Sequence, residues 1–340
     1  MTRVYGAPTH GPERHSITPM QAITAPPPTD VTGFMLVHAA CALIVGVPAV
    51  AVVRRVALVN GWMARPRADR WHREPVALHG GIGVLAALLL ASVLVPSMPS
   101  SLDLSLPGAV LPGVLLLAAV GLVDDLHHLR HWTKLMLQVA GALALGWWIA
   151  QARGLGADDA AVIAAWSLVF CNSVNMLDNM DGACATAAVP CFAGVALFTT
   201  DPRVASLAGA AAGAMLAFWW WNKPQARIFL GDLGALPVGA LFGALAALVS
   251  LELDAQQCEQ VRPWLPAALP VMLGLPFVVD TGFVCITRAA RGQNPMIGGT
   301  DHLTHRALRR GWPAAAVLVV IAALGAAGIV LAGVTVLGWG

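Results

Sequence analysis

Four polar side chains recur at every third position near the middle of the sequence, at Asn172, Asn175, Asp178 and Asp181. They close a long apolar run over residues 160–177, where carboxylates and amides are costly unless they face a cavity or an ion. Steps of three residues rotate by about 300° on an α-helix, so neighbouring pairs can share a ligand, but all four cannot unless the helix loosens. This stretch is therefore the first candidate for a functional site.

Three more polar clusters follow apolar segments elsewhere in the chain. They are Asp124 with Asp125, the stretch 229–232 that ends in Asp232, and the stretch 301–306 with His302, His305 and Arg306. If the clusters meet, up to five carboxylates share one mouth, where the C-terminal ends of helices already present partial negative charge. A hard divalent cation is the simplest partner for such a group.

The ion and the basic residues near it indicate a class of reaction. Mg²⁺ suits oxygen-rich sites that keep open positions for substrate phosphates, and Mn²⁺ is the alternative ion. Lys134, His302, His305 and Arg306 could hold the phosphate oxygens that the metal does not reach. Together these groups indicate phosphoryl transfer, in which the protein positions the reactants and neutralises developing charge.

The composition predicts an all-α membrane protein that crosses the bilayer many times. Of its 340 residues 58% are hydrophobic and only 11% are charged, against about 25% charged in a soluble domain. At about 17–25 residues per crossing, apolar segments occupy residues 34–53, 80–97, 108–123, 134–151, 160–177, 183–200, 204–221, 233–251, 264–286 and 313–338. Three glycines interrupt the last segment, which could form a hairpin, so we expect ten or eleven transmembrane helices.

The two ends of the chain differ in character. Residues 1–32 are rich in Pro, Thr and His, which predicts a flexible tail, and residues 33–340 are expected to form a single integral membrane domain. No short apolar core with a small-residue cleavage site precedes the first span, so we expect no cleaved signal peptide. The six cysteines lie mostly in apolar runs without a CxxC pair, which favours small core residues over disulfides or metal ligands.

The basic residues predict the orientation. Fifteen of the twenty Lys and Arg residues lie in the connections that follow odd-numbered segments, three lie in the other connections, and two lie in the tail. The positive-inside bias then places the odd-to-even connections in the cytoplasm and the N-terminus outside. All four polar clusters follow odd-numbered segments, so we expect the active site at the cytoplasmic mouth.

Each cluster also has a structural interpretation when taken alone. A pair of aspartates at a helix end is often a solvated loop, and His302 and His305 could be interfacial polar residues. The arginines of residues 65–73 could have no role beyond enforcing the topology or attracting anionic lipid headgroups. These separate interpretations do not explain why all the clusters fall on one face.

Five blocks resemble the polyprenyl-phosphate N-acetylhexosamine-1-phosphate transferases of glycosyltransferase family 4, in the family's order. They are RPRADRWHREPVALHGG (65–81), GLVDDL followed by Lys134 and Gln138 (121–138), NSVNMLDNMDG (172–182), FLGDLGA (229–235) and GGTDHLTHRALRRG (298–311). The resemblance implies transfer of HexNAc-1-phosphate from a UDP-N-acetylhexosamine to polyprenyl (undecaprenyl) phosphate, with release of UMP. It implies an enzyme of the bacterial cytoplasmic membrane that initiates cell-surface glycan synthesis and binds no nucleic acid; a homodimer is left open.

The resemblance also implies roles for single residues. Asp232 matches the family's magnesium-binding aspartate, with Asn175 as an amide ligand beside it. Asp124 matches the aspartate that deprotonates or orients the lipid phosphate, with Asp125 next to it and Lys134 facing the phosphates.

Other matched positions imply contacts with the UDP-sugar. Asp181 and Phe229 fall where the family holds and stacks the uracil, and Asp178 lies between the nucleobase and the metal. His302, His305 and Arg306 match the loop that grips the diphosphate. Asn172 and His72 are further candidates for substrate binding.

Departures from the family pattern limit the substrate. His128 stands where a third Asp often follows the pair, Ala235 replaces a Ser, and Asn179 replaces a Gly where positive φ would favour Gly. The last block reads HLTHR and not the triple His of phospho-MurNAc-pentapeptide transferases, which favours a UDP-GlcNAc-like donor and leaves that branch as the runner-up.

Three classes outside the family remain as rivals. A CDP-alcohol phosphotransferase would need further aspartates after the 178–182 stretch, and none follows until Asp201. A secondary transporter would place its carboxylates near mid-bilayer and show internal repeats. A lipid-binding scaffold would release no UMP from a UDP-sugar.

Overall fold

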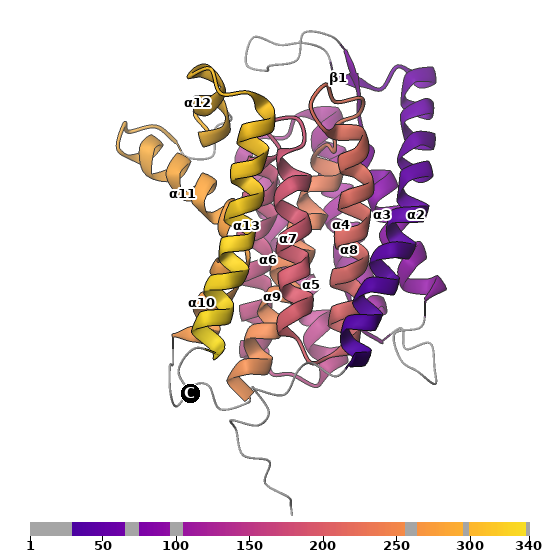
Figure 1. Ribbon diagram of the computed structural model, residues 1–340, viewed down its shortest axis with the longest axis vertical. Helices are drawn as coiled ribbons and strands as arrows, with labels where there is room; N and C mark the ends of the chain where they lie inside the picture. The colour runs from indigo at the N-terminus through magenta and orange to yellow at the C-terminus, as the bar shows by residue number, and fades with distance from the viewer. Residues whose placement is uncertain (1–28, 65–74, 96–104, 256–263, 295–298, 338–340) are drawn as a thin grey trace, which may run out of the picture.

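Apolar helices make up nearly all of the computed structural model, which describes residues 29–64, 75–95, 105–255, 264–294 and 299–337. Most of them run side by side along one axis (Figure 1). In chain order the elements are α2 (Thr29–Asn60), β1 (Met63–Ala64), β2 (Val76–Ala77), α3 (Gly80–Leu94), α4 (Ser105–His127), α5 (His131–Arg153), α6 (Ala157–Leu177), α7 (Ala183–Phe198), α8 (Pro202–Asn222), α9 (Asp232–Ala255), α10 (Leu265–Leu273), α11 (Leu275–Ala289), α12 (Leu303–Arg309) and α13 (Ala314–Leu337).

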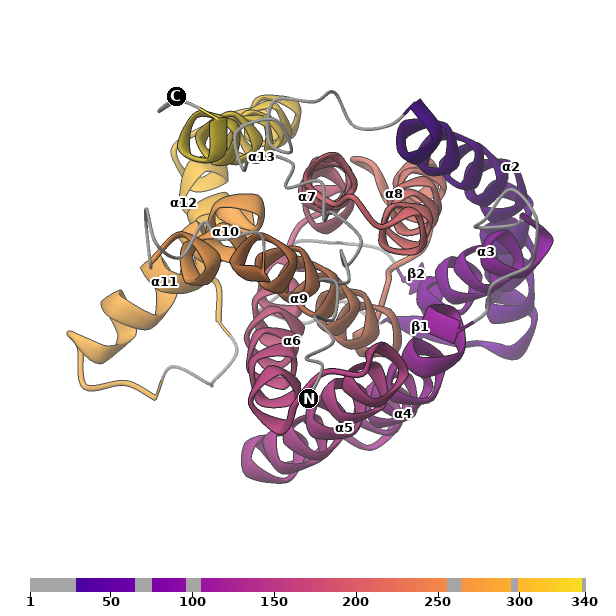
Figure 2. The same ribbon diagram turned by 90° about the horizontal axis from the view of Figure 1, so that it is seen from below.

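Helix α9 lies at the centre of the bundle, between α6, α4 and α10, and its membrane-length window is entirely buried (Figure 2). Glycines let α6 approach it closely. A Cβ atom at Gly239 would lie 2.3 Å from the backbone oxygen of Phe170, and one at Gly243 would lie 2.2 Å from that of Trp166. Close contact between small residues is what holds helices together in a bilayer, where burial of apolar surface offers little.

The all-α membrane architecture is confirmed, but the number of spans differs from ten. Among the described residues seven helices are long and apolar enough to cross a membrane, and the pair α10–α11, bent by 90°, would make eight. Helices α3 and α7 coincide with expected segments but are shorter. Each of the ten apolar segments therefore forms helix, yet two of them fall short of a full crossing by length.

The final segments also differ from expectation. The segment 264–286 is broken at Gly274 instead of forming one rod, whereas the segment 313–338 forms the single helix α13 and no hairpin. Its glycines serve packing: a Cβ atom at Gly325 would lie 2.6 Å from Pro190, and one at Gly328 would lie 2.1 Å from the backbone oxygen of Met272. The expected tail lies largely outside the described residues, although 29–32 belong to α2.

A short hairpin departs from the all-helical pattern at the end of the bundle where α4 and α6 terminate. Met63 and Ala64 of β1 pair antiparallel with β2, and Ala77 bridges to Ile228. Phe229 N–H donates to Ala77 O, while Gly80 N–H donates to Phe229 O, both at 2.8 Å. The chain before α3 is thus fastened to the loop before α9.

Ion pairs join helix termini at the opposite end of the bundle. Arg153 at the end of α5 pairs with Asp201, which caps α8, and approaches Glu252 of α9 to 4.0 Å. Burial acts to raise the pKa of Asp201, but hydrogen bonds from Arg203 and Arg153 outweigh it and hold that pKa below its usual value. These interactions hold the ends of α5, α8 and α9 together.

Candidate functional site

A lysine between two aspartates forms the centre of the candidate site. Lys134, in the first turn of α5, donates to Asp232 at the start of α9 and to Asp124 near the end of α4, 3.1 Å away. Asp124 also accepts a hydrogen bond from Leu129 N–H at 2.8 Å. The three side chains are only partly exposed, at 16–22%, so their charges interact through a poorly screened environment.

Asn175 completes this centre from α6. Its amide donates to Asp232 Oδ1 at 2.7 Å, so residues from α4, α5, α6 and α9 meet at one end of the bundle. Asn172, one turn earlier, donates instead to Leu168 O of its own helix at 3.0 Å. The four polar residues of this stretch therefore do not meet at one ligand, as their helical rotation predicts, and even the neighbouring positions Asn172 and Asn175 bind different partners.

A glycine brings α4 and α9 close enough for the two aspartates to meet. A Cβ atom at Gly121, one turn before Asp124, would lie 2.2 Å from the backbone oxygen of Asp232. Any side chain here would push the helix ends apart. Gly121 thus positions Asp124 against Asp232.

Asp125 is engaged with the backbone. Its two oxygens accept hydrogen bonds from Asp232 N–H at 3.0 Å and Leu233 N–H at 3.1 Å, and His79 Nδ1 lies 3.5 Å away. A carboxylate on the first amides of a helix satisfies donors that have no partner within the helix and complements its dipole. Asp125 therefore caps α9 and fixes the residue that carries the Asp232 carboxylate.

In the turn between α6 and α7 a side chain also accepts hydrogen bonds from backbone amides. Asp181 Oδ2 accepts from Gln225 N–H at 3.1 Å and Ala226 N–H at 2.9 Å, which holds the loop after α8. Asp178 is the C-cap residue of α6, and its backbone N–H donates to Val174 O. The positive φ in this turn falls on Gly182, at 76°, so the concern over Asn179 in place of a glycine is unfounded.

Asn179 instead attaches helix α12 to this turn. Its side-chain oxygen accepts from the Thr304 hydroxyl at 2.7 Å, and its backbone oxygen accepts from His305 Nε2 at 2.9 Å. Burial lowers the pKa of His305, with a smaller opposing effect from its bond to Asn179. The last polar block of the sequence is thereby brought to the same mouth as the turn.

The loop that precedes α12 is bound by a side chain of α11. The guanidinium of Arg288 binds Asp301 through Nε at 2.9 Å and Nη2 at 2.5 Å. These hydrogen bonds lower the pKa of Asp301 to about 2. Arg306 lies over the Phe283 ring, with its guanidinium carbon 4.7 Å from the ring centroid, and donates to Asp301 O.

Two residues that this arrangement depends on were not anticipated from the sequence. Asp280 of α11 contacts His302 Nδ1 at 2.7 Å, and Asn179 links the turn after α6 to α12. Asp280 carried a signal, because it is the acidic residue inside an apolar segment, a placement that marks function by default. Asn179 gave none beyond its departure from the family pattern.

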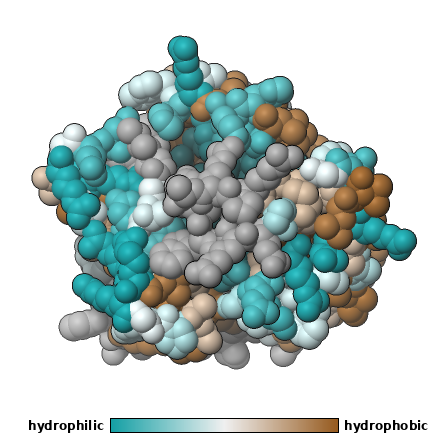
Figure 3. Space-filling view, turned by 90° about the horizontal axis from the view of Figure 1, so that it is seen from above, coloured by the Kyte–Doolittle hydropathy of each residue, from teal (hydrophilic) through white to brown (hydrophobic). Residues whose placement is uncertain are grey.

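Not every candidate can be placed in the centre. Phe229 is half-buried, and its backbone binds β2 and the start of α3. His72 lies outside the described residues. Among the described residues, hydrophilic side chains gather on the face of the bundle at which α4 and α6 end (Figure 3).

The donor atoms of the centre suit Mg²⁺ held together with substrate phosphates. Among the described residues no three His, Cys, Asp or Glu side chains are close enough to bind one metal ion together. The five carboxylates at the mouth therefore do not surround a single ion. Mg²⁺ commonly binds one or two carboxylates together with phosphate oxygens of a substrate. Asp124 and Asp232 can supply the carboxylates. The ammonium of Lys134 touches both, so their oxygens already converge on one cation, and a turned Asn175 amide would add an oxygen.

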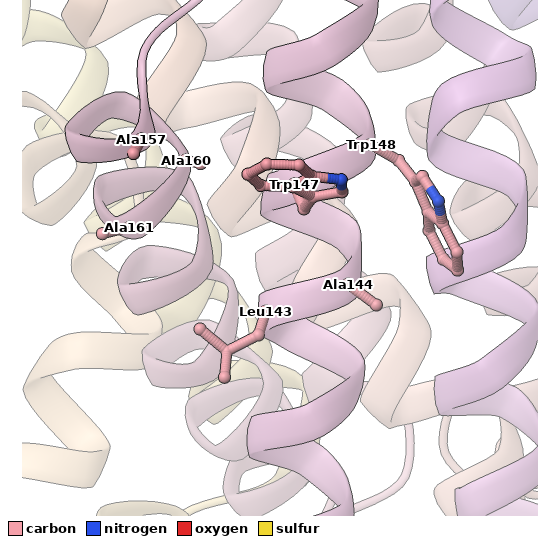
Figure 4. Close-up of a pocket in the computed structure, with 7 residues that line it drawn as sticks. All are labelled: Leu143, Ala144, Trp147, Trp148, Ala157, Ala160 and Ala161. Atoms are coloured by element: carbon pink, nitrogen blue, oxygen red, sulfur yellow. The ribbon is translucent and has the colours of Figure 1, made fainter.

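An apolar groove of about 440 Å³ lies elsewhere, between α5 and α6 (Figure 4). It is lined by Leu143, Ala144, Trp147, Trp148, Ala157, Ala160 and Ala161. None of these described lining residues is titratable, and the groove lies toward the end of α5 opposite Lys134. The groove is therefore separate from the chemistry of the mouth.

Comparison with known proteins agrees with the geometry. A family model described as glycosyl transferase family 4 matches residues 108–250, which include Asp124, Lys134, Asn175 and Asp232. A decaprenyl-phosphate N-acetylglucosaminephosphotransferase of Mycolicibacterium smegmatis is 30% identical over 294 residues, covering 76% of this chain and 71% of the relative. The chain belongs to glycosyl transferase family 4.

Other relatives in glycosyl transferase family 4 carry a different name. A phospho-N-acetylmuramoyl-pentapeptide-transferase of Lactiplantibacillus plantarum is 25% identical over 309 residues, 82% of this chain and 90% of the relative. One of Synechococcus sp. is 33% identical over 181 residues, 53% of this chain and 48% of the relative. Family membership confirms the resemblance and makes the protein an enzyme, which sets aside the transporter, the scaffold and the CDP-alcohol phosphotransferase.

Proposed function

We propose that this protein transfers a HexNAc-1-phosphate, specifically GlcNAc-1-phosphate, from a UDP-sugar to polyprenyl phosphate and releases UMP. The observation that carries the proposal is the meeting of Asp124, Lys134, Asn175 and Asp232 at one end of a membrane bundle of this family. The N-acetylglucosaminephosphotransferase relative and the HLTHR block both favour GlcNAc. The MurNAc-pentapeptide branch remains the second candidate, because several relatives carry that name.

The reaction exchanges one phosphorus–oxygen bond for another. An oxygen of the lipid phosphate attacks the phosphorus that bears the sugar, and the bond from that phosphorus to the bridging oxygen breaks. UMP leaves with the bridging oxygen, and the product is the polyprenyl-diphosphate-sugar. Whether this occurs in one displacement or through an aspartyl-phosphate, the charge develops on the same phosphate oxygens.

Asp232 and Asn175 would hold Mg²⁺, which supplies neutralisation of the diphosphate charge when bound. Lys134 places its ammonium beside both aspartates and can move it to a phosphate oxygen. Asp124 Oδ2 can take the proton of a singly protonated lipid phosphate. Asp125 fixes the start of α9 and so acts as a positioning residue.

The donor would occupy the remainder of the mouth. Asp181 and Phe229 would bind the uracil and Asp178 would lie between it and the metal, with Asn172 and His72 as further contacts. His302, His305 and Arg306 would grip the diphosphate from α12. The enzyme would then work at the cytoplasmic face of a bacterial inner membrane, with α3 and α7 also crossing to give ten spans.

The test is UMP release by purified protein supplied with polyprenyl phosphate and a panel of UDP-N-acetyl sugars. We expect release with UDP-GlcNAc that needs Mg²⁺ and is lost with EDTA. Asp232→Asn should lower kcat at least about 100-fold, because it removes a ligand charge without changing packing volume. Asp158→Asn, an exposed substitution at the opposite end of α6, should retain full activity. Metal-independent release, or near-normal turnover by Asp232→Asn, would disprove the assignment.

A further inference from the structure

A buried aspartate on α11 contacts one of the mouth histidines. Asp280 is 2% exposed and lies in an apolar helix, where a carboxylate is costly unless both oxygens have partners. Its Oδ2 lies 2.7 Å from His302 Nδ1, and its Oδ1 accepts from Leu303 N–H at 2.9 Å. One side chain thus binds an imidazole and the first amide of α12 together.

This contact decides which ring nitrogen of His302 carries a proton. A carboxylate can only accept, so Nδ1 must be the donor. A hydrogen bond at one imidazole nitrogen sets the state of the other. Nε2 is therefore the ring atom left to exchange a proton or a hydrogen bond with a substrate.

The surroundings prevent His302 from turning away. Asp301 before it is held by Arg288, which is itself 5% exposed. The His305 ring packs edge-on against His302 with centroids 5.7 Å apart, and His305 is tied to the 178–182 turn. The imidazole is thus held between α11 and the turn that follows α6.

We propose that Asp280 is a positioning residue that fixes His302 in its Nδ1–H form and so directs Nε2 toward the diphosphate of the sugar donor. This inference rests on the proposed function for the identity of the ligand. The state of the His302 ring does not depend on it, so the two can fail separately.

The variant Asp280→Asn distinguishes the positioning of His302 from capping of α12 alone. The Asn oxygen can still accept from Leu303 N–H, but the amide nitrogen would donate to His302 Nδ1 and force the proton to Nε2. We expect kcat to fall about 10–100-fold, by analogy with the loss of the carboxylate partner of a metal-binding histidine, with the KM for the UDP-sugar changed less than about threefold. If Asp280 only caps α12, Asp280→Asn will keep normal kcat, and the proposal fails.

Two readouts exclude a general loosening of the loop. In ¹⁵N-histidine-labelled protein, the His302 signals, identified by their loss in His302→Gln, should show a proton on Nδ1 that disappears in Asp280→Asn. The matched variant Asp301→Asn breaks the Arg288 pair of the same loop and should leave that proton in place. Loss of the proton in both variants, or in neither, would overturn the proposal.

A double-mutant cycle completes the experiment. Because Asp280 acts through His302, the variant Asp280→Asn/His302→Gln should be no slower than His302→Gln alone, within about twofold. Additive losses would assign Asp280 an independent structural role and contradict the proposal. If no UDP-sugar yields UMP while the ring signals behave as expected, the positioning stands and the proposed function falls.

Discussion

Single carboxylates at the mouth differ in what they bind, although the sequence presents them alike. Asp125 and Asp181 accept from backbone amides, whereas Asp124 and Asp232 face the ammonium of Lys134. Only the second pair keeps charge directed at a position where a substrate or ion could enter. Residue type alone cannot make this distinction, because the amides come from segments that are remote in sequence.

A pH dependence follows from the buried His305. Its lowered pKa means that the folded state binds a proton less readily than the unfolded state, whose value is the usual 6.5. The unfolded state therefore gains protons first as pH falls through 6.5, and stability declines until pH passes the lower folded-state pKa. We expect the thermal midpoint of the wild type to fall more steeply than that of His305→Gln below pH 6.5.

The glutamine variant is the matched comparison for that measurement. Its side-chain amide can still donate to Asn179 O, so the contact that attaches α12 is retained while the titrating group is removed. Thermal unfolding in detergent across the pH range gives both curves. Parallel curves would show that His305 contributes nothing to the acid sensitivity.

At the scale of the helices, the contact between α4 and α9 controls the site. Gly121→Ala would place a methyl group against the Asp232 backbone oxygen, where only 2.2 Å is available. We expect UMP formation to fall about 10–100-fold, because a shift of about 1 Å separates Asp124 from Asp232, and stability to fall by about 1–3 kcal/mol.

The control for that change lies on the same helix. A Cβ atom at Gly108 meets nothing within 4 Å, so Gly108→Ala should leave activity unchanged and stabilise α4 slightly through helix propensity. Activity of both variants is measured as UMP release, and stability as the thermal midpoint. Equal effects of the two substitutions would rule out the contact as the cause.

Helices were largely predictable from the sequence, and their breaks were not. The ten apolar runs identify the rods because hydropathy depends on local composition. The break at Gly274 and the continuity of α13 depend on neighbours: Gly328 is a packing position because Met272 O lies against it. The residues of the candidate centre could be picked out because they lie at the ends of apolar runs, whereas Asp280 lies inside one and meets its partner 22 residues further on.

For the whole molecule, the remaining prediction concerns orientation. The positive-inside count predicts that the mouth faces the cytoplasm. With Cys41, Cys258 and Cys285 replaced by serine, single cysteines at exposed Asn60 and exposed Gln151 report the two ends of the bundle. In intact cells a membrane-impermeant maleimide should label the Gln151→Cys variant, and should label Asn60→Cys only after permeabilisation. The reverse pattern would invert the topology.

Helix α9 has no surface left for lipid, and this constrains how the protein is made. Three of its neighbours, α3, α4 and α6, leave the ribosome before it, while α10 follows. During synthesis α9 must therefore insert into a space between helices that are already in the membrane, and α10 then packs against it. If the space for α9 is filled by another group, or if one of the helices around it is missing, we expect membrane insertion to stop at a protease-sensitive intermediate.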